Sequence, residues 1–306
     1  MAEQRILPEP EWVPRAQAHR SRVATLTAAH RERARLGRRH PVWDFLFTYY
    51  SLRPRQLSVW HPGYGTVLAG PESGRYLTRA GYCAVSDGVT VSREYLRSRL
   101  SAVGFVAGLL RSTAERPPRF GCFGMHEWAM VYRAGAVRHN GVPLRLGPAQ
   151  TDAVLESMPL RCSHFDAYRF FTAPATPRNE HRLSRASQGE SEQPGCLHAN
   201  MDLYKWSYKL GPLVDSDLLL ACLELAADAR ALDMQASPYD LREFGFEPVA
   251  VEEPAGRVEY VRRQGLVAQR AAPLRVALLA RCEQLLADGR DSGPPRRAVG
   301  ASTPDG

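Results

Sequence analysis

Three short segments of the chain combine side chains that often do chemistry in proteins. Each places a histidine two to four residues after a cysteine, with an acidic residue close behind; the segments are residues 122–127, 162–166 and 196–202. Imidazole, thiolate and carboxylate are the usual ligands of zinc and iron, and imidazole and carboxylate are also common general acids and bases. Each segment opens an apolar periodic run, so we expect three helix N-termini, which would form a site if they converge.

Three interpretations of these segments stay open. In the first, His126, His164 and His198 hold zinc or iron in an open, catalytic type of site, with a spacing that matches no standard metal-binding motif. In the second, the histidines act as general acids and bases without a metal, together with three carboxylates: Glu127, Asp166 and Asp202. In the third, the residues are structural: the cysteines are small buried side chains, and Asp166 belongs to a capping box.

The third segment continues into the only two lysines of the chain. Lys205 and Lys209 stand against 38 arginines. They lie one helical turn apart, as do Tyr204 and Tyr208, so each pair shares a helix face. This pattern favours a titratable amine or a phosphate contact, and two solvated surface lysines are the alternative.

The net charge of +8 is concentrated at the N-terminus. Residues 1–40 carry nine arginines and four glutamates, which leaves residues 41–288 close to neutral. A basic arm of this kind can contact phosphate, or it can be a solvated helix face. The sequence has no run of eighteen apolar residues and no signal-peptide core. We therefore expect a cytoplasmic protein with reduced cysteines and no membrane partner.

The candidate residues lie mainly on predicted helices. Apolar spacing predicts helices over residues 11–37, 93–115, 200–210, 215–235 and 256–287, and short β runs over 66–69, 75–78 and 82–85. We therefore expect a mainly α (α+β) protein with a small β-hairpin insert near 64–92. Its predicted parts are a basic N-terminal helix (1–40), a single mainly helical domain (41–288) and a disordered tail (289–306).

Four stretches of the sequence resemble a group of actinobacterial proteins commonly labelled 3-methyladenine DNA glycosylase. They are HPVWDFLFTYY (40–50), FGCFGMHEWAMVY (120–132), RCSHFDAYRFF (161–171) and QPGCLHANMDLYKW (193–206), and the resemblance extends from about residue 11 to 287. It implies a hydrolase of N-glycosyl bonds that removes alkylated purines such as 3-methyladenine from DNA in base excision repair. Such an enzyme flips a nucleotide, stacks its base on aromatic side chains and uses a carboxylate to support an oxocarbenium-like sugar.

The resemblance also suggests roles for particular residues. Asp202 is the first candidate for the catalytic carboxylate, followed by Glu127 and Asp166. The base pocket would be drawn from Trp43, Tyr49, Trp128, Tyr168, Tyr204, Trp206 and Asn200, and the phosphate contacts from Lys205, Lys209 and Arg133. Two other functions remain open. One is a metal-dependent hydrolase or oxygenase that acts on a small-molecule substrate through a three-histidine/carboxylate site, and the other is a non-catalytic nucleic-acid-binding protein that uses the first helix.

Overall fold

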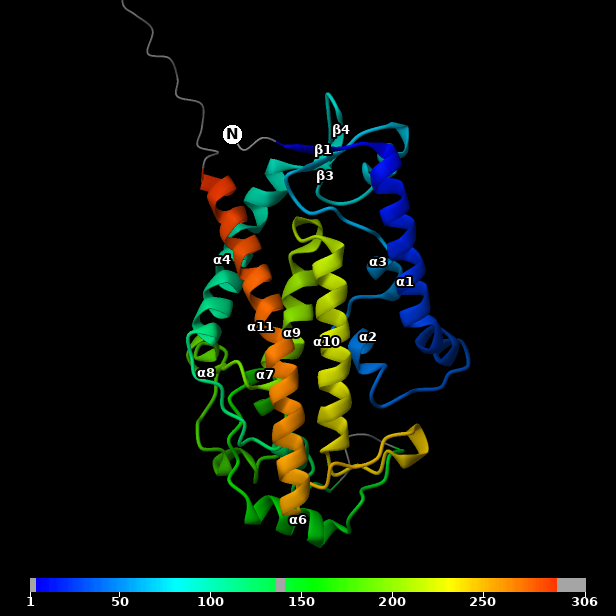
Figure 1. The fold of residues 1–306 in the computed structure, drawn as a ribbon. Helices are drawn as coiled ribbons and strands as arrows, with labels where there is room; N and C mark the ends of the chain where they lie inside the picture. The colour runs from blue at the N-terminus through cyan, green and yellow to red at the C-terminus, as the bar shows by residue number, and fades with distance from the viewer. Residues whose placement is uncertain (1–3, 136–140, 291–306) are drawn as a thin grey trace, which may run out of the picture.

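Four long helices form the centre of the protein. The computed structural model describes residues 4–135 and 141–290. The long helices are α4 (Arg93–Ala114), α9 (Leu197–Lys209), α10 (Ser216–Gln235) and α11 (Pro254–Arg290). Figure 1 shows α11 with α4 on one side and α9 and α10 on the other, and all of these neighbours are in contact with it. Helix α9 is buried over most of its length because its side chains are covered by its neighbours on nearly every side.

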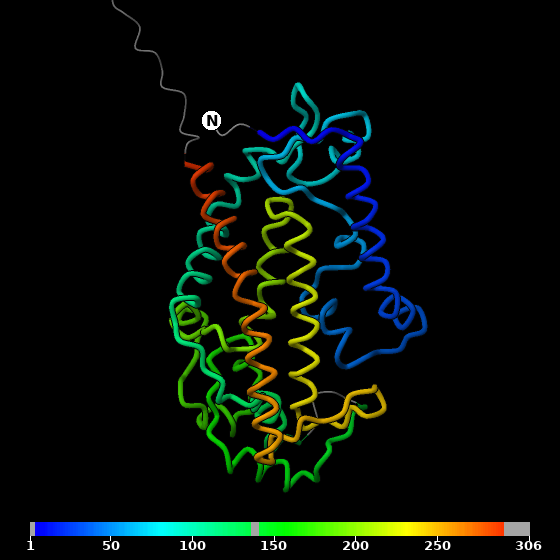
Figure 2. The backbone as a smooth tube through the Cα atoms, in the orientation of Figure 1, coloured from blue at the N-terminus to red at the C-terminus, as the bar shows by residue number. Residues whose placement is uncertain are grey.

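Shorter helices lie in the connections around this bundle. They are α2 (Phe45–Thr48), α3 (Pro54–Leu57), α5 (Met125–Ala129), α6 (Pro148–Ser157), α7 (Phe165–Tyr168) and α8 (Gln188–Ser191), with short 3-10 turns at Pro71–Tyr76, Thr176–Arg178, Gly211–Leu213 and Arg242–Phe244. The segments between α4 and α9, green in Figure 2, wrap around the half of the bundle that lies away from the sheet. These connections carry two of the three cysteine–histidine segments.

A four-stranded sheet covers one end of the bundle. Its strand order is β1 (Arg5–Leu7), β2 (Thr66–Leu68), β4 (Gly88–Val91) and β3 (Tyr82–Val85). Strands β3 and β4 form an antiparallel hairpin, and β1 pairs with β2 in parallel, Arg5 opposite Thr66. The predicted strand at 75–78 is wrong, because Arg75 and Tyr76 are the last residues of a 3-10 helix, and Tyr76 is buried against Trp12.

The long N-terminal helix α1 (Glu9–Arg35) packs firmly on the body. Trp12 is fully buried and its indole N–H donates to the carbonyl of Ala69 at 2.9 Å. Further along the helix, Val23 joins the main core, and Arg22 forms an ion pair with Glu224 of α10. The basic N-terminal segment is therefore part of the packed structure.

The predicted mainly α fold with a small β insert is confirmed. The predicted tail, 289–306, overlaps the end of α11, which runs to Arg290, and the rest of it lies outside the described residues. Within the described ranges, no helix is both long and apolar enough to cross a membrane.

Candidate metal centre

Three histidines from separate segments lie side by side in the interior. His126 is the second residue of α5, His164 directly precedes α7, and His198 is the second residue of α9. The ring centroids of His126 and His198 are 4.3 Å apart, and those of His164 and His198 are 5.3 Å apart. The three segments therefore meet in space, which any joint chemistry of these residues requires.

The backbone before α5 explains how His126 reaches the interior. Phe123 and Gly124 both have positive φ angles, 46° and 67°, so the chain turns sharply just before the helix. A side chain at Gly124 would be strained in this conformation, and its Cβ would lie 3.2 Å from that of Ala236. Because Ala236 caps the C-terminus of α10, this close approach brings α5 against the turn of α10 that carries Asp233.

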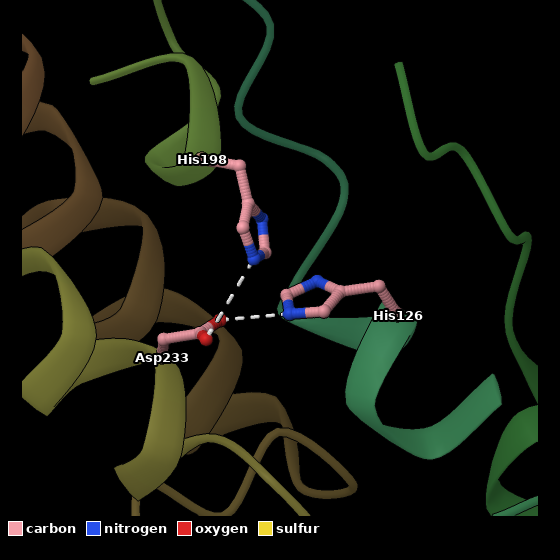
Figure 3. A group of neighbouring side chains, drawn as sticks. All are labelled: His126, His198 and Asp233. Atoms are coloured by element: carbon pink, nitrogen blue, oxygen red, sulfur yellow. Dashed lines mark ion pairs between the residues drawn. The ribbon is translucent and has the colours of Figure 1, made fainter. Parts of the chain in front are cut away.

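His126, His198 and Asp233 form a first set of possible metal ligands (Figure 3), whose ligand atoms all lie within 4.8 Å of one another. Nε2 of His126 is 2.9 Å from Oδ1 of Asp233, and Nε2 of His198 is 3.9 Å from Oδ2. Although His126 Nε2 and Asp233 Oδ1 are both buried, neither has a hydrogen-bond partner. The two atoms are close, but the N–H direction of the imidazole does not align with the carboxylate oxygen as in a hydrogen bond. Two ligand atoms that bind the same ion have this arrangement.

The spacing of this first set and the state of His198 fit a transition-metal ion. Two ligand atoms that lie about 2.1 Å from an ion and at right angles are about 3 Å apart, close to the separation of His126 Nε2 and Asp233 Oδ1. Burial, together with the neighbouring His126, lowers the pKa of His198 well below its ordinary value, so its ring is neutral and can donate a lone pair. Burial would lower the pKa of His126 too, but the neighbouring Asp233 and Glu127 together outweigh burial and raise it, so an ion bound here would replace a proton on His126. Two histidines and a carboxylate occur in zinc hydrolases and in non-haem iron(II) oxygenases.

A buried arginine supplies positive charge beside the first set. Nη1 of Arg230 donates to Oε1 of Glu127 at 2.9 Å and to Oδ2 of Asp233 at 2.8 Å. Burial would raise the pKa of Asp233, but the neighbouring His126, His198 and Arg230 together outweigh burial, so the net shift is downward and the carboxylate is ionised. Oε2 of Glu127 is buried without a hydrogen-bond partner, which leaves it free to accept one.

His164, Glu192 and Asp202 form a second set of possible ligands, all buried. Nε2 of His164 is 3.3 Å from Oε1 of Glu192 and 3.2 Å from Oδ2 of Asp202. The ammonium group of Lys205 also enters this set, since its Nζ is 2.6 Å from Oδ2 of Asp202 and 2.7 Å from Oδ2 of Asp166. The three histidines therefore divide between two ligand sets, His126 and His198 in the first and His164 in the second.

Two hollows reach His198. A pocket of about 80 Å³ is lined by aromatic and charged side chains, namely Phe45, Tyr49 and Phe170 with Glu127, Asp166, His198 and Arg230. A narrow cavity of about 20 Å³ is lined by His126, His198, Tyr260 and the three cysteines of the motif, Cys122, Cys162 and Cys196. This cavity shares Cys122, Arg161, Ser163 and Gln193 with a surface depression of about 710 Å³.

The three motif cysteines lie beside the centre and outside both ligand sets. Their thiols are free. Burial raises the pKa of Cys162 to about 12, and it raises that of Cys196 well above its ordinary value, so both thiols stay protonated. They act in this structure as small apolar walls of the narrow cavity.

Most residues expected in a base pocket lie elsewhere. Tyr49 lines the aromatic pocket, whereas the other predicted members contact other parts of the protein. Four make ring contacts: Trp43 with Phe246, Tyr168 with Phe171, Tyr204 with Tyr50, and Trp206 with Phe105. Nε1 of Trp128 donates to the carbonyl of Ala236, and Oδ1 of Asn200 accepts from Arg275. Aromatic residues fill cores as readily as they bind ligands, so composition alone could not separate these roles.

The predicted phosphate contacts also have other partners. Lys205 is buried against two carboxylates, Arg133 bonds to Glu156 on the surface, and the Lys209 ammonium lies 5.6 Å from the ring centroid of Trp206. Of these three, Lys205 and Arg133 are paired with carboxylates in this structure, and a phosphate contact of these residues stays a prediction.

Sequence reasoning missed Asp233, Glu192 and Arg230. A signal for two of them existed: Arg230 and Asp233 are charged residues three apart on one helix, and such pairs share a face. Glu192 lies at the end of a polar loop, where nothing in the sequence separates it from solvated glutamates. Comparisons with protein-family models, curated proteins and solved structures found no match.

Proposed function

We propose that this protein is a metal-dependent enzyme that acts on a small molecule, with its ion held by His126, His198 and Asp233. The observation that carries the proposal is the close, unaligned approach of two buried ligand atoms, His126 Nε2 and Asp233 Oδ1, at 2.9 Å. The two atoms are at ion-pair distance when His126 is protonated, but they lack the alignment of a hydrogen bond, and a metal ion bound to both would satisfy them equally. The mixed nitrogen and oxygen donors favour zinc or iron over magnesium or calcium.

The aromatic pocket supports a small substrate. Its volume of about 80 Å³ has room for part of a small molecule, and His198 lies on its wall. Glu127 also lines this pocket, and its free Oε2 can accept a proton or a hydrogen bond from a bound substrate. An ion in the first set would supply Lewis acidity and lower the pKa of a bound water. Arg230 holds Glu127 and Asp233 in position through its two hydrogen bonds.

The proposal is tested by the metal content of protein purified without a metal-affinity tag. We expect about one zinc or iron per chain, and a loss of at least tenfold in affinity for His126→Gln and for His198→Gln. His19→Gln is the matched control, because His19 is a buried histidine that bonds to the carbonyl of Leu57 away from the centre. Full metal content in both variants, or no metal in the unaltered protein after reconstitution with zinc or iron(II), would contradict the proposal.

We propose DNA N-glycosylase activity as a second candidate, supported by the aromatic pocket. The rings of Phe45 and Tyr49 stack with centroids 4.7 Å apart, and Phe170 completes an apolar wall on which a base could stack. Two of the three predicted carboxylates, Glu127 and Asp166, line this pocket. Asp202 is buried behind Lys205 and His164, so it is a weaker candidate than the sequence suggested.

An assay of base release from methylated DNA, with and without a chelator, separates the two candidates. A glycosylase of this type needs no metal, so release should survive chelation and fall at least a hundredfold in Glu127→Gln or Asp166→Asn. Asp152→Asn is the control, since Asp152 is a surface carboxylate that accepts from the backbone of Arg133. No release of methylpurine by the unaltered protein would exclude this second candidate.

A further inference from the structure

Lys205 lies where a second metal ion would be expected. It is one of two lysines in a chain with 38 arginines, and it is only 7 % exposed. Its ammonium donates to Asp202 at 2.6 Å and to Asp166 at 2.7 Å, and it lies 4.4 Å from the ring centroid of Trp206. A buried ammonium in such surroundings acts as a fixed positive charge.

The second ligand set has the donor types of a metal site. His164 Nε2, Glu192 Oε1 and Asp202 Oδ2 are buried and lie within 4.8 Å of one another. The set adjoins the first one through the stacked rings of His164 and His198. Two adjoining sets of histidine and carboxylate ligands are the arrangement found in two-metal enzymes.

The oxygen that a second ion would need is already taken by a cation. Oδ2 of Asp202 belongs to the ligand set and is also the atom that receives the Lys205 ammonium, 2.6 Å away. A divalent ion bound to the same oxygen would place two cations at close range in a region of low dielectric, where like charges repel strongly. Binding of a second ion therefore requires that the ammonium leave.

Resting on the proposed function, we infer that Lys205 occupies the cation position of the second ligand set. The centre accordingly holds a single exchangeable ion, in the first set, and a permanent organic cation in the second. Removing the charge of Lys205 leaves Asp202 and Asp166 without their closest counter-charge, and Asp202 together with His164 and Glu192 should then bind a second divalent ion.

The test is the zinc-to-protein ratio after equilibration with zinc(II) and removal of free metal, measured by elemental analysis and native mass spectrometry. We expect one ion in the unaltered protein and two in Lys205→Met, which keeps the length of the side chain and removes its charge. Lys205→Arg keeps the charge and should stay at one. Lys209→Met is the matched control, because it makes the same substitution one turn along α9.

The added ion should depend on the second set alone. Introducing Glu192→Gln into Lys205→Met should return the ratio to one, and Lys205→Gln serves as the second uncharged variant if Lys205→Met does not fold. Two ions in the unaltered protein, or no gain in the uncharged variants, would overturn the inference. If the unaltered protein binds no ion, the proposed function is contradicted. In that case a gain of one ion in Lys205→Met would still support the role of Lys205.

Discussion

The surroundings of His61 change the pKa of its imidazole. Its Nδ1 lies 2.9 Å from the hydroxyl of Tyr82, and its ring stacks on that of Tyr82. Burial lowers the pKa of His61 to about 4, with smaller contributions from His19 and Arg79. The folded protein therefore keeps this imidazole neutral at pH values where an unfolded chain would protonate it.

This shift predicts an acid-sensitive contribution to stability. Between pH 6.5 and 4 the unfolded chain binds more protons at His61 than the folded protein does, so the contribution is complete above pH 6.5 and is lost as the pH falls toward 4. Replacing His61 with Gln removes the titrating group. Between pH 7 and pH 5, the unaltered protein should therefore lose on the order of 1 kcal/mol more of its free energy of unfolding than His61→Gln does. Urea titrations at both pH values measure it, and parallel pH profiles would contradict it.

At the residue scale, only part of the site could be predicted from the sequence, for a physical reason. The spacing of cysteine, histidine and acid within each segment is local, so it singled out His126, His164 and His198 but left open whether they converge. Asp233 lies on α10, more than thirty residues beyond the end of the last segment. No local pattern encodes which carboxylate faces a given imidazole, because that depends on how the helices pack.

At the scale of an element, helix α1 shows that the helix itself can be predicted from local spacing, whereas its packing on the body cannot. Its helical spacing was evident, whereas its arginine content suggested an arm with one face in solvent. The helix is anchored by Trp12, which packs with Leu7, Trp60 and Leu68 beneath the sheet. Burial of one large aromatic side chain outweighs the solvation of several exposed arginines, so the helix is held against the body.

The anchor predicts a large stability difference within one helix. Trp12→Ala removes a fully buried ring and its hydrogen bond to Ala69, and should lower the free energy of unfolding by about 3–5 kcal/mol. Leu26→Ala on the same helix is the control, because Leu26 is 41 % exposed and its truncation should cost less than about 1 kcal/mol. Chemical denaturation compares the two. Equal losses would mean that α1 is not anchored through Trp12.

For the whole molecule, the sequence predicted the kinds of element better than their pairings. The four long helices follow from apolar residues at helical spacing, and all four predictions are confirmed within a few residues. The first strand was missed, because three residues beside a proline carry no alternating pattern and are ordered only by pairing with Thr66 to Leu68. Activity on DNA, and nucleic-acid binding through the first helix, stay predictions.

The parallel pairing of β1 with β2 has a consequence for the order of events during synthesis. The first strand leaves the ribosome before its partner, which follows about sixty residues later. A parallel pair cannot close through a tight turn, so closing this loop costs chain entropy that only later contacts repay. Strand β1 therefore stays unpaired at least until β2 has been synthesised, and the parallel half of the sheet forms only after that point.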